Sequence, residues 1–161
     1  MKIAVYPGSF DPVTNGHVDI IERAASIFGK VYVAVIENPE KKANFDFATR
    51  MRMIKGAARH FRNVRVESFK GLLIDYAKKR KARAIIRGLR AVSDFEYEFQ
   101  MAQTNRKMCP NIETIFFMTD SRYAYLSSSL VRQISKLGGP VRGMVPDNVL
   151  NELKQKENDG K

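Results

Sequence analysis

The segment PGSFDPVTNGH, residues 7–17, gathers residue types that can bind an anion close to the start of the chain. Ser9 supplies a hydroxyl, and the glycine before it lets the backbone approach a ligand closely. His17 follows a second glycine, where the next apolar pattern predicts the start of a helix. A helix N-terminus attracts phosphate and favours a neutral imidazole. The alternative is that Thr14 or Asn15 simply caps this helix and that the histidine lies on the surface.

Cationic side chains follow two other apolar runs in the sequence. Arg87 and Arg90 flank Gly88, an arrangement that suits bidentate phosphate contacts with close backbone approach. Lys41 and Lys42 follow an earlier run, where an ammonium group can reach a transferring phosphate as a flexible point charge. A surface turn is the alternative for the arginines, and a solvated pair is the alternative for the lysines.

Three consecutive serines, residues 127–129, precede a further helical pattern. One serine is enough to cap a helix, so the additional hydroxyl and N–H groups predict a second anion site at a helix N-terminus. Tyr123 and Tyr125, just before the serines, can stack on a base or pack against the protein.

Alternating apolar patterns predict the elements that position these segments. Strands are expected over residues 2–6, 31–36, 64–66, 84–86 and 112–118. Helices are expected near residues 18–28, 51–61, 72–81 and 92–107, from the serines at 127–129, and over 146–156. This order predicts a doubly wound five-stranded parallel sheet with helices on both faces, a Rossmann-like α/β fold, in one domain over residues 1–161. Ligands bind such sheets at the carboxyl ends of the strands, so the predicted anion-binding segments should meet at one rim.

The overall composition narrows the class of protein. The net charge of +11 indicates an anionic partner, which can be nucleic acid, acidic lipid or a phosphorylated small molecule. Cys109 is the only cysteine, which excludes an intrachain disulfide and a thiolate zinc site. No signal peptide or membrane span is recognisable, so we expect a cytoplasmic protein. The basic cluster at 78–83 is interpreted as a solvated helix face, with an RNA-binding patch as its alternative.

Three motifs together resemble a known family over almost the whole chain. T-N-G-H (14–17) resembles the T/H-x-G-H signature of the nucleotidylyltransferase superfamily, and SSSLVR (127–132) resembles its second signature. IIRGLRAVSDFEYEFQMAQTNR (85–106) closely resembles the bacterial phosphopantetheine adenylyltransferase family. The resemblance implies that ATP and 4′-phosphopantetheine react, with Mg²⁺, to give dephospho-coenzyme A and pyrophosphate. It also implies a homohexamer that binds neither nucleic acid nor membrane, and coenzyme A is a further expected ligand through feedback.

The same resemblance assigns roles to individual residues. His17 and Lys41 are the expected catalytic residues, while Mg²⁺ is expected on the ATP phosphates and not on protein side chains. The acceptor substrate is expected to bind Ser9, Lys41, Leu73 and Arg87. ATP is expected to bind Ser9, Phe10, His17, Gly88, Leu89, Arg90, Glu98, Tyr123, Ala124, Tyr125, Leu126, Ser127, Ser128 and Ser129.

Two other functions remain as alternatives at the level of sequence. A nucleotidylyltransferase of the same fold can act instead on nicotinate mononucleotide or on glycerol phosphate, and the superfamily signatures alone do not exclude this. A basic RNA-binding protein would also explain the positive charge. A substrate panel with a pyrophosphate readout separates these functions.

Overall fold

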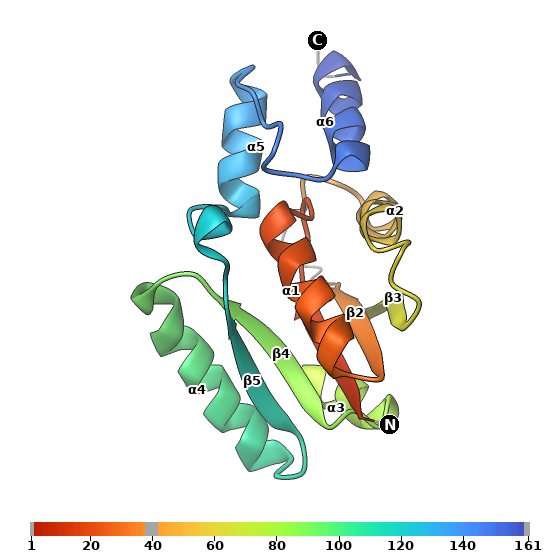
Figure 1. Cartoon of the computed structure of the whole chain (residues 1–161), viewed down its shortest axis with the longest axis vertical. Coiled ribbons are helices and arrows are strands. Elements are labelled where there is room, and N and C mark those ends of the chain that lie inside the picture. The colour runs from red at the N-terminus through yellow and green to blue at the C-terminus, as the bar shows by residue number, and fades with distance from the viewer. Residues whose placement is uncertain (1, 38–41, 160–161) are drawn as a thin grey trace.

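Five parallel strands form a single sheet in the computed structural model, which describes residues 2–37 and 42–159. The strand order is β3-β2-β1-β4-β5, and every neighbouring pair is parallel (Figure 1). The strands are β1 (Ile3–Gly8), β2 (Lys30–Ile36), β3 (Val64–Phe69), β4 (Ala84–Leu89) and β5 (Glu113–Met118). The predicted parallel α/β sheet is therefore confirmed.

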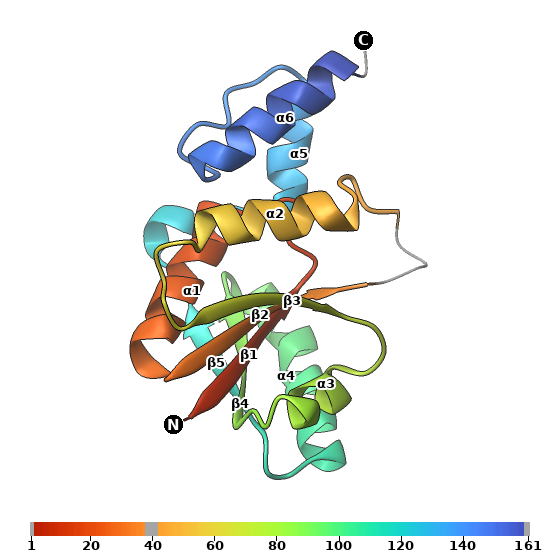
Figure 2. The ribbon, with the colours of Figure 1, turned by 90° about the vertical axis from the view of Figure 1, so that its right-hand side faces the viewer.

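Helices cover both faces of this sheet. Figure 2 shows α1 and α2 on one side of the strands and α3 and α4 on the other, while α5 and α6 lie together at the end of the molecule away from the N-terminus. The helices are α1 (Asn15–Ile27), α2 (Phe47–Ala57), α3 (Leu73–Lys79), α4 (Val92–Met108), α5 (Ser128–Lys136) and α6 (Asp147–Asp159), with a short 3₁₀ turn at Ser121–Tyr123. Among the described residues, no helix is long and apolar enough to cross a lipid bilayer.

The alternating side chains of the central strands explain the two-sided packing. On β2, Val31, Val33 and Val35 join the core beneath α1 and α2, whereas Ala34 joins the core beneath α3. All four side chains are fully buried, as expected for a parallel sheet covered on both faces. This explains why the second strand has a continuous apolar run instead of an alternating one.

Some element boundaries differ from the predicted ones. β4 continues to Leu89 and β3 to Phe69, because each pairs with its neighbour beyond the apolar run that marks it in the sequence. Arg87 therefore lies within a strand, opposite Phe116 of β5, and not in the turn after it. The second helix begins at Phe47, four residues before the predicted start, because Asp46 caps it by accepting a hydrogen bond from the Thr49 N–H.

The chain order reverses between β1 and β4. β1 is followed along the chain by β2 and β3 on one side, and β4 then returns to its other side. Gly88 on β4 lets α1 pack closely here, since a Cβ at this position would lie 2.3 Å from Cδ1 of Ile20. Such a reversal is where open α/β sheets bind ligands, beyond the carboxyl ends of the strands.

Candidate active site

A cavity of about 460 Å³ lies at this reversal point. The ends of β1 and β4 form its floor, and the first turns of α1, α4 and α5 contribute to its walls. Twelve of the residues predicted from sequence line it: Ser9, Phe10, His17, Arg87, Gly88, Arg90, Glu98, Tyr123, Leu126, Ser127, Ser128 and Ser129. Segments separated by more than a hundred residues in sequence thus meet at one rim, as the fold predicts.

Four further predicted residues do not line the cavity. Leu89, Ala124 and Tyr125 are adjacent in sequence to lining residues but do not line the cavity themselves. Leu73 begins α3 and packs, partly buried, against the core on the opposite face of the sheet. Lys41 lies outside the described residues.

His17 and Thr14 form a reciprocal cap at the start of α1. The Thr14 N–H donates to Nδ1 of His17 at 3.0 Å, and the Thr14 hydroxyl oxygen accepts a hydrogen bond from the His17 N–H at 3.4 Å. Because Nδ1 is an acceptor, a neutral ring carries its proton on Nε2. Thr14 therefore caps the helix, as the alternative interpretation expected, but His17 lines the cavity and does not lie on the outer surface.

The environment of His17 favours its neutral form. Burial, together with the nearby guanidinium groups of Arg90 and Arg87, lowers the pKa of His17 to about 4. Sequence reasoning expected a neutral imidazole from the helix N-terminus alone, whereas the main cause in the structure is loss of solvent. The Phe10 ring contributes to this burial, with its centroid 5.1 Å from that of the imidazole.

Arg87 is held in the floor of the cavity by Glu98 of α4. Its Nε and Nη2 atoms donate to the two carboxylate oxygens at 2.7 and 2.5 Å, and Nη1 donates to the Pro7 carbonyl at 3.2 Å. Glu98 is 8% exposed, so this bidentate pair is largely shielded from water. The Glu98 carboxylate thus contacts Arg87, and it orients a cation that faces the cavity.

Arg90 is oriented by two different elements. Its Nε donates to the Asp94 carboxylate at 3.1 Å, and Nη1 donates to the Leu126 carbonyl at 3.0 Å. These contacts join the end of β4 to α4 and to the segment before α5. The guanidinium is therefore fixed beside the cavity before any ligand arrives.

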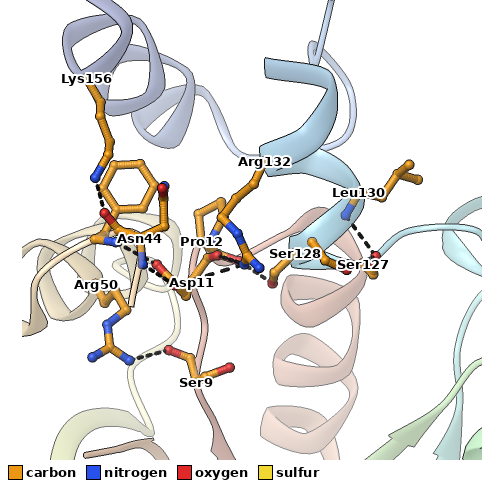
Figure 3. A network of polar contacts seen from close by, with 12 residues as sticks. Ser9, Asp11, Pro12, Asn44, Arg50, Ser127, Ser128, Leu130, Arg132 and Lys156 are labelled. Carbon is orange, nitrogen blue, oxygen red and sulfur yellow. Dashed lines mark hydrogen bonds and ion pairs between the residues drawn. The ribbon is translucent and has the colours of Figure 1, made fainter. Parts of the chain in front are cut away.

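The three serines at the start of α5 all have partners within the protein. The Ser127 hydroxyl caps α5 by accepting from the Leu130 N–H at 3.1 Å, and it lies 3.0 Å from the Ser129 hydroxyl. The Ser128 hydroxyl donates to the Pro12 carbonyl at 2.7 Å (Figure 3). Ser128 therefore also ties α5 to the loop after β1, a structural role that the sequence interpretation did not include.

Several lining residues were not predicted. Arg132 stands in the quoted SSSLVR motif, and its Nη1 donates to the Asp11 carbonyl at 2.5 Å, but no role was assigned to it. Asp94 was likewise inside a quoted motif, so motif membership was the available signal for both. Thr119 directly follows the expected strand 112–118, so its place at the rim was available from the fold rule, although no role was assigned to it. Ile20 carried no signal, since its place in the lining depends on how α1 packs.

The acidic groups of the site are already engaged. Asp94 and Glu98 are paired with Arg90 and Arg87. Within residues 2–37 and 42–159, no group of three or more histidine, cysteine or acidic side chains is arranged to hold a metal ion. The described residues therefore do not fit a Mg²⁺ site built from protein side chains.

Comparison with known proteins agrees with this geometry. Residues 5–134 match the model of the cytidylyltransferase-like family. A phosphopantetheine adenylyltransferase of Alkaliphilus metalliredigens is 53% identical over 97% of this chain and 99% of its own length. The corresponding protein of Clostridium tetani is 51% identical over 98% of this chain and 99% of its own.

A solved structure supports the fold independently. A Vibrio parahaemolyticus protein assigned as a nicotinate-nucleotide adenylyltransferase superposes with a TM-score of 0.71 at 17% identity, covering 95% of this chain and 91% of that one. At this identity the likeness establishes the shared fold alone. The full-length similarity to the curated relatives is more specific, and it shows that the chain is a nucleotidyltransferase belonging to the phosphopantetheine adenylyltransferase family.

Proposed function

We propose that the chain transfers the adenylyl group of ATP to 4′-phosphopantetheine, giving dephospho-coenzyme A and pyrophosphate. The observation that carries this proposal is that the three segments resembling the family, 14–17, 85–106 and 127–132, all contribute side chains to one cavity. The names of the full-length relatives support the choice of acceptor. The proposal also includes a cytoplasmic location and, through the family resemblance, feedback binding of coenzyme A.

The proposed reaction is a direct displacement on the α-phosphorus of ATP. An anionic oxygen of the acceptor phosphate forms the new P–O bond, while the bond to the oxygen bridging the α- and β-phosphates breaks and pyrophosphate leaves. The nucleophile is already ionised, so no general base is needed, and catalysis rests on positioning and electrostatics. This fits a site whose carboxylates are paired with arginines.

His17 is well suited to stabilise the transition state. With Nδ1 occupied by the Thr14 N–H, the Nε2–H of the neutral ring remains to donate to an α-phosphate oxygen. Arg87 and Arg90 supply positive charge for the two polyanionic substrates, and the N-terminus of α5, which lines the cavity, is suited to bind phosphate oxygens. Lys41 as a ligand of the acceptor phosphate stays a prediction.

Mg²⁺ on the ATP phosphates also stays a prediction. The described residues offer no metal cage, so no step above is derived through the ion. When bound to the nucleotide, the ion would neutralise charge on the leaving pyrophosphate.

The proposal includes the homohexamer, and α4 supports an assembly of this kind. Its inward residues Glu98 and Asn105 are polar and buried, whereas Phe95, Tyr97 and Phe99 are 45, 62 and 48% exposed. A helix whose apolar side chains point outward is expected to bury them against another chain. Phe95 also contacts Phe116 of β5, so this apolar surface continues onto the edge strand.

Product formation tests the proposed reaction. Incubation of the chain with ATP and 4′-phosphopantetheine should release pyrophosphate and form dephospho-coenzyme A in equal amounts, measured by an enzyme-coupled assay and mass spectrometry. Absence of both products, from a folded preparation, would overturn the proposal.

A further inference from the structure

Arg50 of α2 is a buried cation next to the candidate active site. The reaction proposed above assigns no role to this residue. The residue is 7% exposed, and its Nη1 donates to the Ser9 carbonyl at 2.9 Å (Figure 3). Its guanidinium carbon lies 5.0 Å from the centre of the Phe47 ring. Ser9 itself is exposed and lines the cavity. Arg50 therefore holds the backbone of a residue whose side chain is available to a ligand.

The turn that Arg50 contacts has an unusual backbone. Phe10 is a non-glycine residue with φ of +47°, a left-handed conformation that side chains rarely adopt. The Phe10 side chain is 1% exposed and packs edge-on against both Tyr6 and His17. Such a conformation persists only when its surroundings fix it, and the Arg50 bond to the preceding carbonyl is one of these restraints.

The charge of Arg50 is not compensated like that of the neighbouring arginines. Arg87 and Arg90 pair with Glu98 and Asp94, whereas Arg50 makes no ion pair with a carboxylate of the described residues. Its Nε is buried and has no hydrogen-bond partner. A buried cation that has no anionic partner within residues 2–37 and 42–159 is costly, so its presence here points to a role in the site.

We propose that Arg50 is a positioning residue for adenylyl transfer: it fixes the Ser9–Phe10 turn through the Ser9 carbonyl, and its positive charge favours an anionic phosphate bound at Ser9. This inference rests on the proposed function. The turn joins β1 to α1 and packs on His17, so a loosened turn displaces both Ser9 and His17 from their working positions. Displacements of this kind lower the rate at saturating substrate more than they weaken binding of the whole nucleotide.

Graded substitutions at Arg50 test the proposal. Arg50→Met removes the donor and the charge at similar length, Arg50→Gln keeps a donor without charge, and Arg50→Lys keeps both. For folded variants we expect kcat to fall about 10- to 100-fold in Arg50→Met, less in Arg50→Gln and least in Arg50→Lys. Equal kcat values across the folded variants and the unsubstituted chain would overturn the proposal. If only the Gln and Lys variants fold, it is overturned when Lys retains no more activity than Gln.

Arg52 provides a matched control on the same helix. It is exposed and paired with Glu152, so Arg52→Met should leave kcat within twofold. Hydrogen exchange gives a readout independent of activity: the peptide spanning residues 7–14 should exchange faster in Arg50→Met and unchanged in Arg52→Met. Unchanged exchange in both variants contradicts the positioning role. If exchange is faster in Arg50→Met but the unsubstituted chain forms no product, only the proposed reaction is contradicted.

Discussion

At the scale of single residues, the site depends on side chains whose hydrogen-bond roles are fixed before substrate arrives. Thr14 assigns Nδ1 of His17 as an acceptor, and burial keeps the ring neutral. Glu98 orients Arg87, and Asp94 orients Arg90. Donors arranged in advance are the main way in which an enzyme stabilises developing charge, since no reorganisation is then required during the reaction.

His17→Gln separates the catalytic role of the imidazole from its capping role. In a capping box that begins with threonine, a glutamine three residues later can accept the hydrogen bond from the threonine N–H. The start of α1 should therefore remain helical in this variant. We expect kcat to fall about 10²- to 10³-fold, the usual effect of losing one preorganised donor. Pyrophosphate release measures this, and turnover close to that of the unsubstituted chain would remove His17 from the mechanism.

The same variant should also change the pH dependence of stability. The pKa of His17 is about 4 in the folded chain and about 6.5 when unfolded, so the unfolded state binds the extra proton between these values. The stabilising contribution of the neutral ring is complete above pH 6.5 and declines as the pH falls towards 4. Urea unfolding at pH 7.5 and pH 5 should show a larger loss of stability in the unsubstituted chain than in His17→Gln. Equal losses would mean that the ring titrates normally.

At the scale of elements, the site depends on α1 packing closely over β4. Gly88 permits this approach, and the terminal methyl of Ile20 fills the space that a side chain would need. The contact between Ile20 and Gly88 therefore fixes the position of α1 and of His17 in its first turn. Ser128 and Arg132 similarly fix α5 against the loop after β1.

Gly88→Ala should destabilise the fold by about 1–3 kcal/mol, because the added methyl overlaps the Ile20 side chain. Ile20→Val removes the atom that would clash, at a cost of about 0.5–1.5 kcal/mol when made alone. The double variant should thus be more stable than Gly88→Ala, as measured by urea unfolding. Simple additivity of the two losses would show that Ile20 is not the obstacle.

At the scale of the whole molecule, the exposed apolar surface of α4 makes the proposed homohexamer testable. Phe99→Glu places a charge on this surface, and light scattering should then show a mass well below six times the 18.4 kDa of one chain. Leu137→Glu is the control, because Leu137 is 80% exposed at the end of α5, far from α4 in Figure 1. Equal masses for Phe99→Glu and the unsubstituted chain would place the interface elsewhere.

The sequence predicted those features that depend on local pattern. The apolar run at 31–36 and the amphipathic spacing of α1 were enough to predict the parallel sheet. The rule that ligands bind open sheets at the carboxyl ends of the strands then predicted that Ser9, His17 and Arg87 lie close together. It did not predict that β4 continues through Arg87, that Glu98 is engaged with this arginine, or that Arg50 supports Ser9. These features depend on which distant elements pack together, which no local pattern records.

The central claim is the identity of the acceptor, and a comparison of kcat/KM for competing acceptors tests it most directly. The chain should be assayed with ATP and 4′-phosphopantetheine or nicotinate mononucleotide, and with CTP and glycerol phosphate, under one pyrophosphate-release assay. We predict that 4′-phosphopantetheine is preferred by at least about 10³-fold, a ratio typical of sites whose buried polar groups are matched to one substrate. A kcat/KM for nicotinate mononucleotide or glycerol phosphate that equals or exceeds that for 4′-phosphopantetheine would contradict the account.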